Sequence, residues 1–360
     1  MTPGQERMLE RVRANDQYPE RGEIRIKRTN NAQQWCFERI SPKYNESWYN
    51  NGQLKSLFDK TTGVEKEWYE NGCLKCATTY KGGEKDGEQK EWSPNGQLKS
   101  RCNYNNGLLD GISKKWHSNG QPYSEINHKE GWREGLARWW HKNGQLSYRE
   151  NYKNDKLDGL RESWNKGGVL EYREIYREGK LNGLCEEWYE NGKLYSQINF
   201  KDGREYGPYE TRYPNGALWV RGNSRNGEQD GIVEEWHENG RLHQKENYKD
   251  GKPHGLHEEW YDNGRPCYRT NYKNGKREGE QLQWYSNGQL QFRMFFKEEM
   301  RNGVEEKWSK SGKLVYRKNY KDNELDGIKE EINADGTVTQ SLYKDGVILS
   351  SKVIAGFTDK

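Results

Sequence analysis

Paired glutamates are the side chains of this sequence whose type and spacing come closest to acid–base chemistry. They occur as Glu186-Glu187, Glu234-Glu235, Glu258-Glu259, Glu305-Glu306 and Glu330-Glu331. Two carboxyl groups can serve as acid and base when both face the bond that breaks. Adjacent residues of a β-strand point to opposite faces of a sheet, so no pair converges if these segments are strands. A carboxylate ladder that recurs along the chain also lacks the single asymmetric environment that such catalysis needs.

Two spacings of cysteine and histidine resemble parts of a metal site. Cys73-x-x-Cys76 has the spacing of half a zinc site, but no second pair accompanies it, and residues three apart on a strand face opposite ways. His254-x-x-His257 flanks a predicted turn. Three other histidines follow a tryptophan where most repeats carry tyrosine, and we interpret them as aromatic substitutes: His117, His141 and His237. The sequence therefore predicts no catalytic, cofactor-binding or metal-binding residue, and a protein that is not an enzyme.

These residues lie within a strict repeat. An (Asn-)Gly-x-Leu signature recurs every 24 residues, with its glycine at Gly72, Gly96, Gly120, Gly144, Gly168, Gly192, Gly216, Gly240, Gly264, Gly288, Gly312 and Gly336. A tryptophan precedes most of these glycines by four residues, at Trp68, Trp92, Trp116, Trp140, Trp164, Trp188, Trp236, Trp260, Trp284 and Trp308. A period in this range is typical of repeat proteins, in which one repeat cannot bury its apolar face alone.

Each repeat is predicted to be a β-hairpin, because two short alternating segments flank the Asn-Gly pair. A three-residue loop, with glycine at the left-handed position of a G1 bulge, pairs Trp188 with Leu194. We expect this register because it places Leu184 and Phe200 on the same face as that pair. The second turn, within residues 201–207, must then have odd parity. The sequence thus predicts one stripe of tryptophan, leucine and tyrosine along one face.

Together the repeats predict an all-β fold, an elongated, twisted or curved single-sheet array of about twelve hairpins over residues 47–346. Residues 1–46 fit no period. There we expect a small cap or module with a short helix near residues 3–14, where Thr2-Pro3-Gly4-Gln5 has the pattern of a capping box, followed by one or two strands. Residues 347–360 are predicted to form a capping strand and tail. The sheet edges would also permit end-to-end self-association.

Composition and charge limit the classes of partner that this chain is expected to bind. Only 30% of the residues are hydrophobic and 32% are charged, yet 15 Trp and 24 Tyr supply the apolar area of a thin folded core. The net charge of +4, with interleaved acids, argues against nucleic acid and against a membrane surface. The absence of an apolar span, of a signal peptide and of a cysteine framework predicts an intracellular, cytoplasmic protein. A row of bases could pair with the glutamates across strands: Lys81, Lys129, Lys153, Arg177, Lys201, Arg225, Lys249, Lys273, Lys297 and Lys321.

One repeat departs from the pattern at several positions. Arg212 occupies a tryptophan position, Trp219 is near enough in sequence to fill the gap, and Ser224 replaces the tyrosine. This cluster could mark a docking point or a kink, and it could equally be drift of the repeat.

The string Trp188-Tyr189-Glu190-Asn191-Gly192-Lys193-Leu194, continued by Phe200-Lys201-Asp202-Gly203 and Gly207, resembles the MORN-repeat variant family, which includes YwqK-type antitoxins. The resemblance spans about residues 47–346, although the ordinary MORN pattern carries tyrosine where this chain carries tryptophan. It implies a binding or assembly module. We therefore expect a non-enzymatic scaffold that binds a protein partner along an extended face. The alternatives left open are an antitoxin-like neutraliser of a toxic protein and a structural component of a virion or other large assembly.

Overall fold

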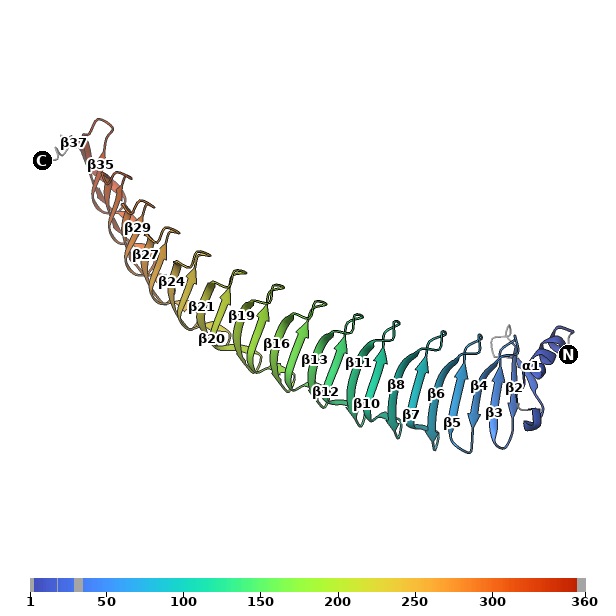
Figure 1. The fold of residues 1–360 in the computed structure, drawn as a ribbon. Coiled ribbons are helices and arrows are strands. Elements are labelled where there is room, and N and C mark those ends of the chain that lie inside the picture. Colours follow the sequence, from blue (N-terminus) through green and yellow to red (C-terminus); the bar gives the residue numbers. More distant parts are fainter. Residues whose placement is uncertain (1–2, 18, 29–34, 355–360) are drawn as a thin grey trace. The chain divides into compact units, whose positions relative to one another are not determined.

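The computed structural model describes residues 3–17, 19–28 and 35–354. Two compact halves, residues 1–180 and residues 181–360, are distinguished by the contacts within each. In both halves the strands are antiparallel and pair with their neighbours in sequence, so that successive hairpins lie side by side in one layer (Figure 1). The predicted all-β fold of hairpin repeats in a single sheet is confirmed.

The first half contains α1 (Pro3–Ala14), η1 (Pro19–Arg21), β1 (Arg25–Arg28), β2 (Trp35–Ile40), β3 (Tyr44–Trp48), β4 (Leu54–Asp59), β5 (Val64–Trp68), β6 (Leu74–Lys81), β7 (Glu84–Trp92), β8 (Leu98–Asn105), β9 (Leu108–Leu109), β10 (Gly111–Trp116), β11 (Pro122–Lys129), β12 (Trp132–Trp140), β13 (Leu146–Lys153), β14 (Lys156–Leu157), β15 (Gly159–Trp164) and β16 (Leu170–Arg177). The division between the halves falls at β17 (Lys180–Leu181). The second half contains β18 (Gly183–Trp188), β19 (Leu194–Lys201), β20 (Arg204–Arg212), β21 (Leu218–Arg225), β22 (Glu228–Gln229), β23 (Gly231–Trp236), β24 (Leu242–Lys249), β25 (Lys252–Pro253), β26 (Gly255–Trp260), β27 (Pro266–Lys273), β28 (Lys276–Arg277), β29 (Gly279–Trp284), β30 (Leu290–Lys297), β31 (Met300–Arg301), β32 (Gly303–Trp308), β33 (Leu314–Lys321), β34 (Glu324–Leu325), β35 (Gly327–Ile332), β36 (Val338–Lys344) and β37 (Val347–Ile354).

The hairpin loop has the geometry that its Asn-Gly sequence predicts. In the hairpin of β18 and β19, Trp188 pairs with Leu194. The N–H of Tyr189 donates to the carbonyl of Lys193 at 2.9 Å, and the N–H of Gly192 donates to the carbonyl of Tyr189 at 2.8 Å. Gly192 has a φ of +78°, a left-handed value that glycine adopts at little cost. The predicted three-residue loop with a G1 bulge is confirmed.

The prediction of one stripe that combines tryptophan, leucine and tyrosine is wrong. Beyond the Trp188–Leu194 pair the register shifts, and Tyr195 becomes an extra residue in its strand. This second bulge reverses the alternation of side chains along the strand. Leu184 therefore lies on the face of Trp188, as predicted, whereas Phe200 lies on the opposite face.

The second turn is shorter than the predicted odd-parity turn. Asp202 and Gly203 form a two-residue turn, with φ of +52° and +81°, and Lys201 pairs with Arg204. Positive φ at both central residues is the signature of the tightest common hairpin turn. The following strand then carries extra residues opposite Asn199. This irregularity keeps equivalent residues of successive repeats on the same face.

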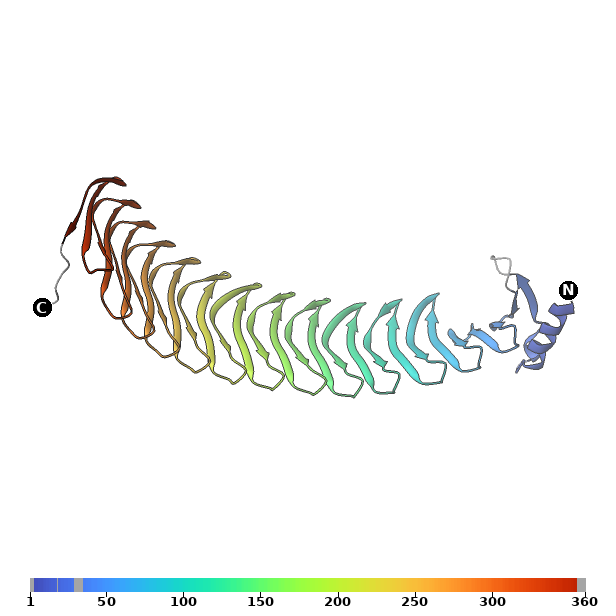
Figure 2. The same ribbon diagram turned by 90° about the horizontal axis from the view of Figure 1, so that it is seen from above.

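The N-terminal segment adds a second layer over the first hairpins. α1 buries Leu9 and Val12 against Ile24, Phe37 and Trp48, and Figure 2 shows the helix, in dark blue, against the first strands. The predicted helix near residues 3–14 and the two strands that follow it are confirmed. Thr2, the first residue of the predicted capping box, lies outside the described residues.

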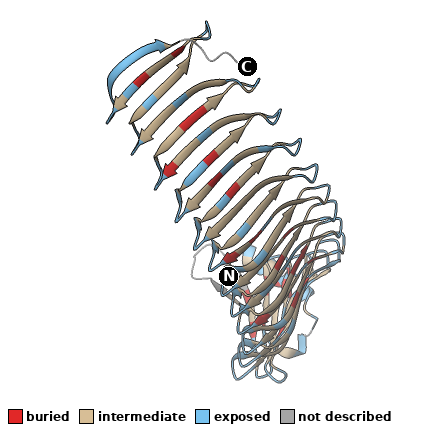
Figure 3. Cartoon of the chain, turned by 90° about the vertical axis from the view of Figure 1, so that its left-hand side faces the viewer, coloured by how far each residue is buried: buried red, intermediate tan, exposed pale blue. Residues whose placement is uncertain are grey.

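Elsewhere in each half few side chains are buried (Figure 3). A sheet of one layer has solvent on both faces, so most strand residues are of intermediate exposure. In the second half β37 pairs with β36, and its Val347, Leu349 and Val353 are 62–65% exposed. The role of this strand as a cap stays a prediction.

Candidate protein-binding interface

One face of the sheet carries the tryptophans, and we call it the indole face. In each repeat it holds the tryptophan, its paired leucine or proline, and the residues two and four positions before the tryptophan. The contacts of Arg221 show this arrangement: its guanidinium lies 5.3 Å from the ring centre of Trp236 and 2.6 Å from the carboxylate of Glu234. Hydrogen bonds from Arg221 and Lys245 hold the pKa of Glu234 below its usual range. Indoles and charges thus lie side by side on this face.

All the predicted tryptophans lie on the indole face, each paired with a leucine or proline, and all are half-buried. They are Trp68, Trp92, Trp116, Trp140, Trp164, Trp188, Trp236, Trp260, Trp284 and Trp308. The signature glycines that follow them all have φ between +78° and +95°. Trp48, which α1 covers, is only 3% exposed. The indoles of the open repeats are therefore more exposed to solvent than the indole under α1.

A ladder of ion pairs follows the middle of the indole face. Arg317 lies 2.8 Å from Glu306 and 3.5 Å from Glu330, and Arg293 lies 3.8 Å from Glu306. Partly exposed pairs of this kind contribute about 0.2–1 kcal/mol each. The bases of this ladder are not the predicted row, whose members end their strands at the second turn and are exposed, as Lys201 is. The prediction of which bases pair with the glutamates was therefore wrong.

The opposite face, which we call the tyrosine face, carries the aromatic residues that end the second strand of each hairpin. These are Tyr80, Tyr104, Tyr152, Tyr176, Phe200, Tyr248, Tyr272, Phe296 and Tyr320. Cations cover several of these rings, with Arg133 at 4.0 Å from the ring centre of Tyr152 and Arg277 at 4.0 Å from that of Phe296. Burial, together with a hydrogen bond to Glu150, raises the pKa of Tyr152. Cations of the chain itself therefore occupy the surface of several rings on this face.

Two rows of side chains join successive repeats, and the sequence-based predictions missed both. Where Tyr or His follows the tryptophan position, its side chain bonds to the backbone carbonyl at the tryptophan position of the next repeat. Tyr69 donates to Trp92 at 2.9 Å, and Nε2 of His141 lies 2.9 Å from the carbonyl oxygen of Trp164. The loop asparagine, such as Asn191, donates to a carbonyl 23 residues further on. The recurrence of Tyr or His at one repeat position was the signal for this bond. It confirms the interpretation of the histidines as aromatic substitutes: His117, His141 and His237.

The residues with catalytic or metal-binding potential do not converge. Glu258 lies 3.7 Å from Arg269 on the indole face, whereas Glu259 lies 2.9 Å from His257 on the tyrosine face. Burial raises the pKa of the Cys76 thiol, which disfavours the thiolate that metals bind. Within residues 3–17, 19–28 and 35–354, no three His, Cys, Asp or Glu side chains gather as a metal site requires. In the same ranges no helix has the length and apolarity to cross a bilayer.

The irregular repeat has its own compensations. Arg212 takes the tryptophan position, pairs with Leu218 and hydrogen-bonds to Glu210 at 2.7 Å. Trp219 does not fill the gap, contrary to the prediction. It is the extra residue of the bulge, and its indole N–H donates to Glu235, at 3.2 Å, on the tyrosine face.

On the tyrosine face Ser224 stands where other repeats carry an aromatic ring, and a tyrosine of the neighbouring strand lies close by. Ser224 is buried and donates to Glu205 at 3.2 Å. Tyr209 lies over Gly222, where a Cβ atom would stand 2.5 Å from the tyrosine oxygen. A docking role for this repeat stays a prediction.

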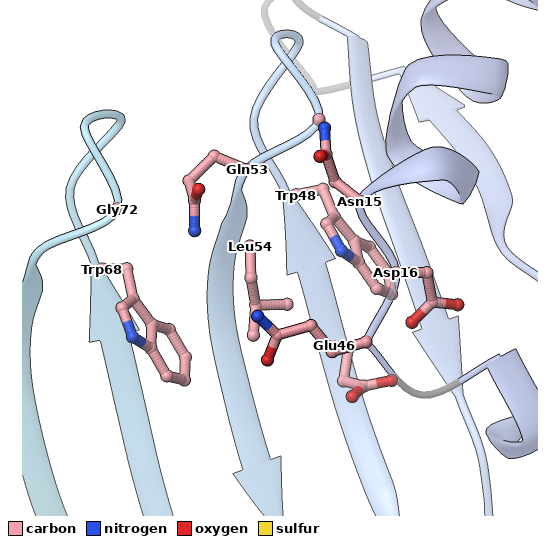
Figure 4. Close-up of a pocket in the computed structure, with 10 residues that line it drawn as sticks. Asn15, Asp16, Glu46, Trp48, Gln53, Leu54, Trp68 and Gly72 are labelled. Carbon is pink, nitrogen blue, oxygen red and sulfur yellow. The ribbon is translucent and has the colours of Figure 1, made fainter.

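Directly beyond α1 the indole face carries apolar side chains at two positions of the ladder. Leu57 and Ala77 occupy positions of the ladder that hold arginine in later repeats, and both pair with Lys66. A pocket of about 200 Å³ opens here between the end of α1 and the first hairpins (Figure 4). It is lined by Asn15, Asp16, Gln17, Glu46, Trp48, Gly52, Gln53, Leu54, Trp68 and Gly72.

Comparison with known proteins identifies the repeat. The model of the MORN repeat variant family matches residues 61–81, 85–106, 109–130, 133–154, 181–202, 229–250, 253–274, 277–298 and 301–322, together more than half of the chain. No curated protein matches the chain. Two solved structures, "Crystal Structure of TcdB2-TccC3" and "Crystal Structure of TcdB2-TccC3-Cdc42", are each 10% identical to it; the matches cover 89% and 92% of this chain and 25% and 24% of theirs, with TM-scores of 0.16 and 0.14. The chain spans about a quarter of those chains, and at such TM-scores the likeness carries no argument.

Proposed function

This chain belongs to the MORN repeat variant family, and from that premise we propose that it is a non-enzymatic scaffold that binds a protein partner along its indole face. The observation that carries the proposal is the exposure of the tryptophans. Those of the open repeats are half-buried, whereas Trp48 under α1 is 3% exposed. Aromatic side chains with a polar surround are typical of the centres of protein–protein interfaces.

The arrangement of charges also supports binding over catalysis. The paired glutamates face opposite ways, and those on the indole face are engaged by arginines of the same sheet. An antitoxin-like neutraliser and a component of a large assembly are both special cases of such a scaffold. End-to-end self-association would use the strand β37 and not the indole face.

The proposal is tested by cross-linking the native protein to whatever co-purifies with it and mapping the linked lysines by mass spectrometry. We expect the partner to link to Lys66, Lys90 and Lys114 on the indole face, and not to Lys75 or Lys99 on the tyrosine face. The double substitution Trp92→Ala, Trp116→Ala should lower the yield of partner. Equal linking of both faces, or no partner beyond that of an unrelated repeat protein, would contradict the proposal.

A further inference from the structure

We propose that the indole face next to α1, over strands β4 to β8, binds an acidic amphipathic α-helix of a protein partner. This inference rests on the proposed function and adds to it the place on the sheet and the chemistry of the partner. It is carried by a helix already seated on this face, by the continuation of the same surface beyond that helix, and by the charges around it.

α1 shows how a helix lies on the indole face. Its Leu9 and Val12, one turn apart, pack against Phe37 and Trp48, and Leu54, which pairs with Trp48, contacts the same cluster. Leu9, Val12 and Trp48 are at most 5% exposed. Apolar residues spaced by three or four positions are the anchors with which a helix binds an apolar surface.

The surface that α1 covers continues over the next hairpins. Trp68 and Trp92 repeat the position of Trp48, each with its paired leucine, and both are half-buried. Leu57 on β4 and Ala77 on β6, the two strands that flank Trp68, occupy ladder positions, so apolar side chains extend here from the tryptophan–leucine pairs into the middle of the face. The pocket at the end of α1 lies between the covered part of this surface and the open part (Figure 4).

A helix fits this surface better than an extended segment does. Strands β4 to β8 each pair with a neighbour on both sides, so none of them has a free edge to which a partner strand could be added. A segment that lies on the face must satisfy its own backbone hydrogen bonds, and an α-helix does so.

The cations of the indole face favour acidic residues on the helix that binds there. Under α1 the Arg39 guanidinium, which is almost fully buried, lies 2.7 Å from the carboxylate of Asp16, just beyond the end of the helix. This contact shows that the segment directly after a helix seated on this face meets a cation of the ladder with a carboxylate.

Beyond α1 the cations of the ladder outnumber its acids. Lys90 and Arg101 share the single carboxylate of Glu88, at 2.6 Å and 2.5 Å. Lys66 is exposed and forms no ion pair within the described part of the chain. Carboxylates on a partner helix would complement this excess, which favours an acidic helix over a basic one.

The test uses the full chain and three fluorescein-labelled synthetic peptides. The first is a short amphipathic helix with leucine at every third or fourth position and glutamate elsewhere. The second has the same composition in scrambled order, and the third carries lysine in place of glutamate. We expect the first to bind, by fluorescence anisotropy, at least about tenfold more tightly than either of the others.

Matched variants of the protein locate the site. Lys66→Glu should weaken binding of the acidic peptide about tenfold, whereas Lys99→Glu, on the tyrosine face of a neighbouring hairpin, should leave it unchanged. Circular dichroism checks that both variants keep the fold. Absence of binding, equal binding of the scrambled peptide, tighter binding of the lysine peptide, or an effect of Lys99→Glu equal to that of Lys66→Glu would each overturn this inference. The proposed function would survive such a result, because cross-linking of the natural partner tests it independently.

Discussion

The hairpin under α1 and the open hairpins beyond it have the same local geometry in different surroundings. Trp48 pairs with Leu54 just as Trp92 pairs with Leu98. Yet Trp48 is 3% exposed and belongs to a buried cluster, whereas Trp92 is half-buried. The register of a hairpin therefore does not depend on a buried core. The loop sequence and the neighbouring strands set it, and the helix adds stability afterwards.

The open hairpins replace burial with lateral contacts. Their tyrosines bond to the backbone of the next repeat, their arginines bridge glutamates of successive hairpins, and cations stack on the rings of the tyrosine face. In a repeat array, stability is approximately the sum of each repeat and its contacts with its neighbours. The free energy of each such contact is small, so substitutions in the open repeats should cost less than those under α1.

Truncation of tryptophan should separate the two regions most clearly. Trp48→Ala removes a fully buried indole and should destabilise the N-terminal hairpins by about 3–5 kcal/mol. Trp92→Ala removes a partly exposed indole and should cost about 1–2 kcal/mol. Hydrogen exchange of the amides in β3, β4, β7 and β8 measures both local values. Equal losses at the two sites would mean that α1 contributes no stability.

The second-largest effect is expected for Arg39, the ladder residue under α1. Arg39 is 2% exposed and holds Asp16 and Glu46. Arg39→Met removes a cation that two buried carboxylates share and should cost about 3 kcal/mol. Arg173→Met, at the equivalent open position, leaves Arg149 in contact with the buried Glu162 and should cost about 1 kcal/mol. Hydrogen exchange of the α1 amides at increasing urea concentration measures the first value. Exchange of the β16 amides under the same conditions measures the second.

A pH titration should distinguish one open repeat from its neighbours. His257 is 8% exposed; burial by itself would lower its pKa, but the hydrogen bonds that its ring donates to the carboxylates of Glu246 and Glu259 outweigh burial and raise the pKa to about 9. Since the folded pKa exceeds the ordinary value of 6.5, the stabilisation is complete below about pH 6.5 and is lost as the pH rises through about 9.

The expected loss is about 3 kcal/mol in the repeat of β26 and β27. His257→Gln, which introduces the residue found at Gln281 in the next repeat, should abolish the pH dependence. Hydrogen exchange of the amides in β26 and β27, corrected at each pH for the intrinsic exchange rate, measures this loss of stability. A pH-independent wild type would show that the two glutamates do not hold the histidine in its charged form.

The hairpins could be predicted from the sequence, whereas the distribution of residues between faces could not. The pair of Trp188 and Leu194 followed from the Asn-Gly loop, which is local chemistry. The position of Phe200 depended on a second bulge at Tyr195, and no residue type marks such a bulge. The Arg39–Asp16 contact joins a helix to a strand outside the period, so no repeat pattern could reveal it.

The smallest expected effect concerns the bonds between repeats. Tyr261 donates to the carbonyl of Trp284 at 2.6 Å, and Tyr261→Phe removes that bond while keeping the ring. The loss should be about 1 kcal/mol. Tyr49→Phe, which removes the equivalent bond to Trp68 next to the cap, costs the same free energy. In the open repeat, however, no second layer resists opening, so exchange of the amides in β29 should accelerate about fivefold. If the amides of β5 accelerated more than those of β29, the lateral bonds would matter most beside the cap, and the view that they substitute for a second layer would be wrong.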